Sequence, residues 1–173
     1  MAFTNPLRQL SVAYVEGSFD IPIAPYTDAT GAAYKIGSLL TPSGGDMVAS
    51  TAGTPTTNIA GVAAQAGSGI TGTHVTGSVG NAGVVTPLLM YVAADGVVFE
   101  GSFASNGGDD SPDASDMFVN YGLTLDSGTG FWYVDSNKTT TSASVIVVGI
   151  KQDSSGINEG RVYFKFLRAN TSY

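Results

Sequence analysis

The last part of the chain alternates apolar and polar residues, and this pattern constrains the fold most. In residues 161–167, RVYFKFL, apolar side chains take every second position, and Arg161, Tyr163 and Lys165 lie between them. Because successive side chains of a strand point to opposite faces, we predict a half-buried strand with a basic outer row. The upstream run Val145–Ile150 is continuously apolar, which predicts a central strand covered on both faces.

Further short strands are predicted along the chain, with Gly-rich turns between them. The candidates are Ser11–Val15, Tyr34–Leu40, Asn58–Gln65, Val84–Val92, Val97–Phe103 and Phe131–Val134. Gly contributes 23 of the 173 residues, and abundant Gly and Thr oppose long helices. Short strands with such turns are typical of sandwiches and small barrels. The predicted fold class is therefore all-β, an antiparallel β-sandwich or small β-barrel, with its C-terminal third an antiparallel meander.

The first 30 residues differ from the rest because they mix apolar groups with Pro6, Pro22 and Pro25. Proline fixes its own backbone and removes a hydrogen-bond donor, so this segment suits an extended arm better than a core element. The remaining length fits one hydrophobic core. We therefore predict an N-terminal extended arm over residues 1–30 and a single all-β domain over residues 31–173.

The charge of the chain excludes several classes of partner. The net charge is −7, whereas nucleic acids and anionic membranes demand a basic surface. No stretch of 18 apolar residues is present. Charged residues make up only 12% of the chain, against about 25% in typical soluble domains. This composition suits a protein packed against neighbours in an assembly, and residues 151–173, with four bases and two acids, hold its one expected positive face.

Motifs for catalysis or cofactor binding are weak in this sequence. His74 is the only histidine, and no Gly-x-Ser-x-Gly motif accompanies it. Residues 67–72 match the Gly-x-Gly-x-x-Gly string of dinucleotide-binding proteins, but no helical pattern follows to hold the phosphates. The chain is therefore expected to be no enzyme and to bind no cofactor.

An acidic loop and a group of aromatic residues leave two further interpretations open. The loop Asp109–Asp116 carries four aspartates that suit either calcium binding or a solvated turn, with Ser111 as the expected helix N-cap. Aromatic residues concentrate in the later strands around Trp132 and Tyr133. They are expected to form core, with a sugar-binding surface as the alternative.

Several strand segments together resemble a known class of proteins. They are Ile59–Ala63, Tyr121–Leu123, Trp132–Asp135, Val145–Gly149 and Gly160–Phe166. This series, which covers most of the chain from about Ile36, resembles the small β-rich decoration or cement proteins of tailed-phage heads. The resemblance implies a structural virion protein on the outer capsid surface that binds and stabilises the major capsid protein lattice. Such proteins are commonly trimers or capsomer-bound copies, and a homotrimer is favoured here.

The resemblance also implies where the partner binds, because such proteins often attach through an N-terminal arm. The residues expected to contact the capsid or a sister subunit are Phe3, Leu7, Arg8, Leu10, Val12 and Tyr14. Two other functions remain as alternatives, a phage tail or baseplate component and a carbohydrate-binding receptor-recognition domain.

Overall fold

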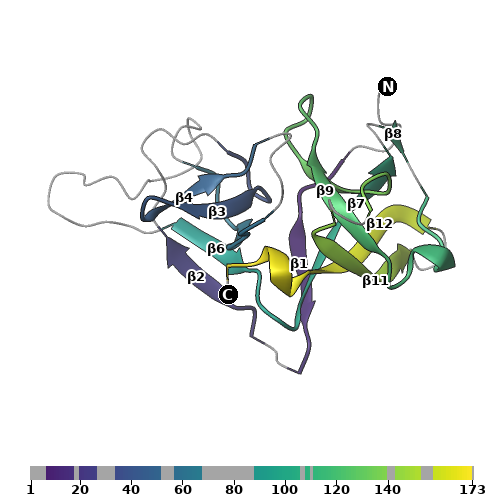
Figure 1. Cartoon of the computed structure of the whole chain (residues 1–173), viewed down its shortest axis with the longest axis horizontal. Coiled ribbons are helices and arrows are strands. Elements are labelled where there is room, and N and C mark those ends of the chain that lie inside the picture. The colour runs from purple at the N-terminus through teal and green to yellow at the C-terminus, as the bar shows by residue number, and fades with distance from the viewer. Residues whose placement is uncertain are drawn as a thin grey trace, which may run out of the picture.

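The protein folds into two β-sheets with no helix longer than a single turn among the described residues (Figure 1). The computed structural model describes residues 7–17, 20–26, 34–51, 57–67, 88–105, 108–109, 111–139, 143–152 and 158–172. Within these ranges, no helix is long and apolar enough to cross a membrane. The all-β prediction is confirmed.

The first sheet contains the longest strands of the protein. Its strands follow the order β1-β7-β10-β9-β11-β12, and the short strand β8 pairs with β7 outside this path. Their bounds are β1 Ser11–Val15, β7 Val97–Ser105, β8 Gly108–Asp109, β9 Asn120–Leu125, β10 Trp132–Asp135, β11 Val145–Gln152 and β12 Asn158–Phe166.

Five strands of this sheet close into a ring, which makes the unit a small barrel. β12 pairs not only with β11 but also with β7, in the register Phe164↔Phe99 and Val162↔Gly101. The ring therefore runs β7-β10-β9-β11-β12 and back to β7. Closure removes the unpaired edges that an open sheet would leave.

The second sheet is open and smaller, with the order β2-β6-β5-β3-β4. Its strands are β2 Ile23–Tyr26, β3 Leu39–Ser43, β4 Asp46–Ala49, β5 Gly61–Ala63 and β6 Leu88–Val92. All of its pairings are antiparallel. In Figure 1 this sheet lies on the left and the barrel on the right.

One hydrophobic core joins the two sheets. Leu39, Ile59 and Val62 of the second sheet and its flanks belong to the same buried cluster as Phe99 and Trp132 of the barrel. The C-terminal tail adds a second link, because Ile59 N–H donates to the Asn170 carbonyl over 2.8 Å. The two sheets are thus parts of one packed body.

The N-terminal segment is built into this body, in contrast to the predicted arm. β1 pairs with β7, and β2 pairs with β6, so both sheets contain strands from residues 1–30. Leu10 is fully buried in the main core. A Cβ on Gly101 would lie only 2.6 Å from Leu10 Cδ2, which shows how tightly this segment is packed. The described part of residues 1–30 is therefore core structure and edge strand.

The turn at Ala94–Gly96 carries the chain from β6 in one sheet to β7 in the other. Two further expectations about the strands are wrong. The C-terminal third is no simple meander, since β11 pairs with β9 and not with the preceding strand β10. β10 instead pairs parallel with β7. Only one face of β11 is fully covered, because Val145 and Val147 are buried whereas Ile146 and Val148 are half-buried.

Candidate interaction surface

The six residues expected to contact a partner lie in different environments. Leu7 and Leu10 are buried within the chain, and Val12 packs against the core. Arg8 is exposed, and Tyr14 is 47% exposed at the edge strand β1. Phe3 lies outside the described residues. Leu7 and Leu10 are thus inaccessible to a partner in this fold, and Arg8 and Tyr14 are the two accessible members of the set.

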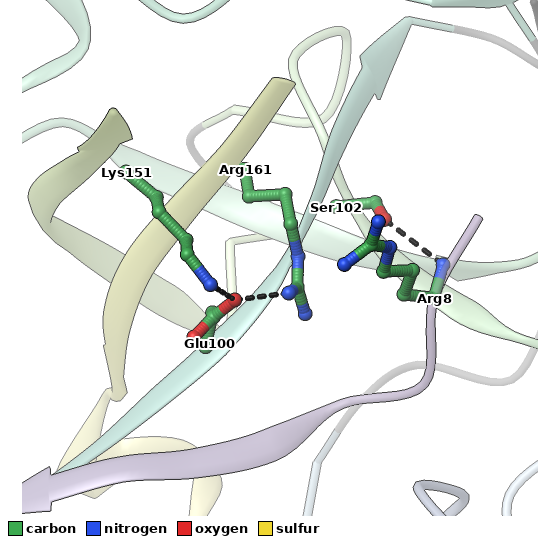
Figure 2. A network of polar contacts seen from close by, with 5 residues as sticks. All are labelled: Arg8, Glu100, Ser102, Lys151 and Arg161. Atoms are coloured by element: carbon green, nitrogen blue, oxygen red, sulfur yellow. Dashed lines mark hydrogen bonds and ion pairs between the residues drawn. The ribbon is translucent and has the colours of Figure 1, made fainter. Parts of the chain in front are cut away.

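The predicted basic row of β12 is neutralised by acidic residues of neighbouring segments. Figure 2 shows Lys151 and Arg161 approaching the same carboxylate oxygen of Glu100. Lys151 Nζ lies 2.7 Å from this oxygen, and Arg161 NH1 contacts it as well. The side chains of Arg161 and Glu100 are only 10% and 12% exposed, so this ion pair is largely withdrawn from water.

The other two bases of the C-terminal region are also paired. Lys165 Nζ lies 2.6 Å from Glu16 Oε2, and Arg168 NH1 lies 3.7 Å from Asp95 Oδ2. The bases of the predicted positive face are therefore all paired with acids of the same chain, and the Arg168–Asp95 pair lies at the surface, with both side chains largely exposed. Tyr163 of the same row contacts the ring of Tyr14 edge-on, with centroids 6.2 Å apart.

Arg8 lies at the border of this network. Its backbone N–H donates to Ser102 Oγ over 3.2 Å, and Ser102 is the register partner of Arg161 on β12. Figure 2 shows Arg8 next to Ser102 and beside Arg161. The hydrogen bond fixes the chain at the point where it enters β1.

The aromatic strands do not form a sugar-binding surface around Trp132. The side chains of Trp132 and Tyr133 are each only 2% exposed, and both belong to hydrophobic clusters. Phe99, Phe164 and Phe166 pack against one another with centroids 5.0 to 5.9 Å apart. The prediction that these aromatics form core is confirmed, and the alternative based on Trp132 is wrong.

The acidic loop contains a single 3-10 turn, η1 (Ala114–Asp116), whose cap is Asp113 and not Ser111. Asp113 Oδ1 accepts from Ser115 N–H over 2.7 Å, and Asp116 Oδ2 accepts from Asp113 N–H over 2.7 Å. The hydrogen bonds from Ser115, first from its side chain and then from its backbone, lower the pKa of Asp113. Two of the four aspartates are thus committed to a capping box.

The described part of the chain contains no assembled site for metal binding or for histidine catalysis. No group of three or more His, Asp or Glu side chains comes together there in a way that could hold a metal ion. His74, residues 68–72 and Asp110 lie outside the described residues.

Phe118, directly after η1, is the functional candidate that sequence reasoning missed. Its side chain is 71% exposed, more than any other large apolar side chain that the structure describes. Its φ is +62°, in the left-handed region that glycine and asparagine usually occupy. This conformation costs a bulky residue about 1–2 kcal/mol. Strain of this kind persists only where the surrounding structure enforces it, and it is most common at functional sites.

Backbone hydrogen bonds on both sides enforce the conformation of Phe118. Its own N–H donates to the Val147 carbonyl of β11 over 2.8 Å. The N–H of Val119 donates to the Asp116 carbonyl over 3.2 Å, and Tyr121 Oη donates to Asp116 Oδ1 over 2.5 Å. These hydrogen bonds hold the turn in place while the ring of Phe118 remains exposed to solvent.

Other large apolar side chains are exposed near strand edges. Ile21 and Ile23 are 43% and 50% exposed, and Ile23 lies in β2, which pairs with β6 alone among the strands that the structure describes. Pro25 in the same strand has no N–H group to offer to an added strand, which protects such an edge against aggregation. A partner at this edge is therefore expected to bind through side chains and not by adding a strand to the sheet.

No protein-family model matches the chain, no curated protein is significantly similar to it, and no solved structure matches it. Its function therefore has to be inferred from its own residues and their arrangement.

Proposed function

We propose that the chain is a structural virion protein that binds the outer surface of a tailed-phage capsid and cements the lattice of its major capsid protein. The observation that carries the proposal is the exposure of large apolar side chains on a fixed backbone. Phe118 stands on a capped turn, whereas Tyr14 and Ile23 lie on strands paired with neighbours. Aromatic side chains presented on a pre-organised backbone are typical anchors of protein–protein contacts.

The arrangement of charge supports the same proposal. The bases of the C-terminal region pair with acids of this chain, so they add little net positive charge to its outer face. Interfaces are depleted of charged residues at their centre and enriched in aromatic residues. The strand signatures of decoration proteins, noted in the sequence, point in the same direction.

Cementing requires no bond chemistry, because binding alone stabilises the assembled state. A ligand that binds only the assembled lattice stabilises it by RT ln(1 + [L]/Kd), about 2.7 kcal/mol per site at a hundredfold excess over Kd. Attachment of an oligomer, with a trimer favoured, raises the effective concentration at neighbouring sites. The protein thus acts through mass action on the capsid.

The test compares phage heads assembled with and without the chain. We expect purified chain to co-sediment with expanded heads that lack it and to raise their disruption temperature in a concentration-dependent manner. Heads that bind no chain, or that are equally resistant to heat without it, would overturn the proposal. Immunogold labelling on tails alone would favour a tail or baseplate component instead.

A further inference from the structure

Phe118 is exposed without any gain to the fold of its own chain. A ring that is 71% exposed contributes little to the core, and its φ of +62° disfavours any bulky side chain at this position. Neither local backbone preference nor burial therefore accounts for phenylalanine here. A contact outside the chain would account for it.

The turn that carries Phe118 is organised before any partner arrives. The capping box of Asp113 and Asp116 fixes η1, and the bond from Phe118 N–H to the Val147 carbonyl ties the turn to the barrel. A side chain with two rotatable bonds on such a support loses little entropy when it binds. Aromatic anchors with these properties dominate the binding energy of many interfaces.

The described residues next to Phe118 along the chain indicate the charge of the partner. Residues 111–119 contain Asp113 and Asp116 and no lysine or arginine. Hydrogen bonds from Ser115 lower the pKa of Asp113, so its carboxylate is ionised at neutral pH. A complementary surface presents basic residues around the point where the ring enters, because like charges facing each other oppose association.

We propose that Phe118 is the anchor of the contact with the capsid lattice and that it enters an apolar pocket rimmed by Lys or Arg side chains of the capsid protein. This inference rests on the proposed function and deepens it by naming the contact. It assigns the principal contact to the turn after η1, in place of the N-terminal residues Leu7 and Leu10.

The test uses the full-length chain and expanded heads that lack it. Phe118→Gly removes the ring and suits the positive φ, and Asn58→Gly is its matched control, since exposed Asn58 has the same φ of +62°. Asp113→Asn removes one charge and keeps a good N-cap. We expect Phe118→Gly to weaken binding at least about 30-fold, the range of an anchor residue, with Asn58→Gly unchanged. Asp113→Asn should weaken binding about two- to fivefold and reduce its salt dependence.

The outcomes separate this inference from the proposed function. If wild-type chain binds heads and Phe118→Gly binds equally well, the inference is overturned and the proposed function stands. If wild-type chain does not bind heads, both are overturned. Should Phe118→Gly fold poorly, Phe118→Asn tests the same point, because asparagine also tolerates a positive φ. Binding of Asp113→Asn that is as tight and as salt-dependent as wild type would overturn the basic rim.

Discussion

Replacement of Leu10 by alanine tests whether the N-terminal segment is part of the core. Leu10 is 1% exposed and belongs to the main hydrophobic cluster. Its Cδ2 atom packs against Gly101 of β7, next to the ring of Phe164 on β12. A detachable arm would contribute little to the stability of the domain, whereas a core segment contributes like any buried strand.

The size of the expected effect follows from the atoms removed. Leucine to alanine deletes three carbon groups, worth about 2.4 kcal/mol at about 0.8 kcal/mol for each buried group. Because β7 and β12 are fixed by ring closure, the site cannot collapse fully, and the residual cavity raises the cost to about 3–4 kcal/mol. For a chain of this size, such a loss lowers the melting temperature by about 6–16 °C.

Urea unfolding followed by tryptophan fluorescence provides the measurement, since Trp132 is buried in the same cluster as Leu10. Gln9→Ala is the matched control, because Gln9 is the exposed neighbour of Leu10 and should change the unfolding free energy by less than about 0.5 kcal/mol. A Leu10→Ala variant that unfolds within about 0.5 kcal/mol of wild type would refute the assignment of this segment to the core.

Three other substitutions test separate features. Glu100→Gln removes the carboxylate that Arg161 and Lys151 share in a largely buried setting. It should lower the free energy of unfolding in urea by about 2 kcal/mol, and a decrease of less than about 0.5 kcal/mol would contradict this. Phe118→Gly should leave the unfolding free energy unchanged or raise it by up to about 1 kcal/mol, because it relieves the strained φ; a clear loss would mean that the ring packs on its own chain. Hydrogen bonds from Thr129 lower the pKa of Asp126 in the folded protein. The ionised carboxylate therefore stabilises the fold above the ordinary aspartate pKa, and this stabilisation is lost as the pH falls through the lowered pKa of the folded state. The loss of unfolding free energy caused by Asp126→Asn should therefore become smaller in acid, and a loss that does not change with pH would contradict this.

Local patterns in the sequence predict much of the strand content. The strand at Ser11–Val15 has the predicted bounds, and the alternation in residues 161–167 correctly places Val162 and Phe164 in the core. These features depend on the alternation of buried and exposed side chains along a strand, which can be read from a few neighbouring residues. Strands close in sequence, such as β11 and β12, also pair as predicted.

Pairings between distant segments do not follow from local patterns. Closure of β12 onto β7 and the parallel pair of β10 with β7 join segments that are 30 to 65 residues apart. Nothing in the residues of Ala94–Gly96 indicates that the turn changes sheets. The prolines of the first 30 residues suggested an arm, yet Pro22 and Pro25 are compatible with β2 because this strand lies at a sheet edge.

The candidate site could not be predicted from the sequence either, because it also depends on contacts between distant segments. The alternation predicts Arg161 in the outer row of its strand, and the approach of Glu100 on β7 explains how its charge is accommodated with little exposure. Phe118 resembles a core residue in the sequence because it is apolar and follows a helical turn. Its left-handed backbone is imposed by the hydrogen bond to Val147 on a distant strand, and no glycine or asparagine marks the position.

The central claim is that this chain acts by docking on an assembled capsid, and a cryo-EM reconstruction of heads incubated with purified chain tests it most directly. We predict added density on the outer capsid surface at every equivalent lattice site, with the turn after η1 facing the capsid protein. A reconstruction that is identical to untreated heads at saturating chain concentration would contradict the claim.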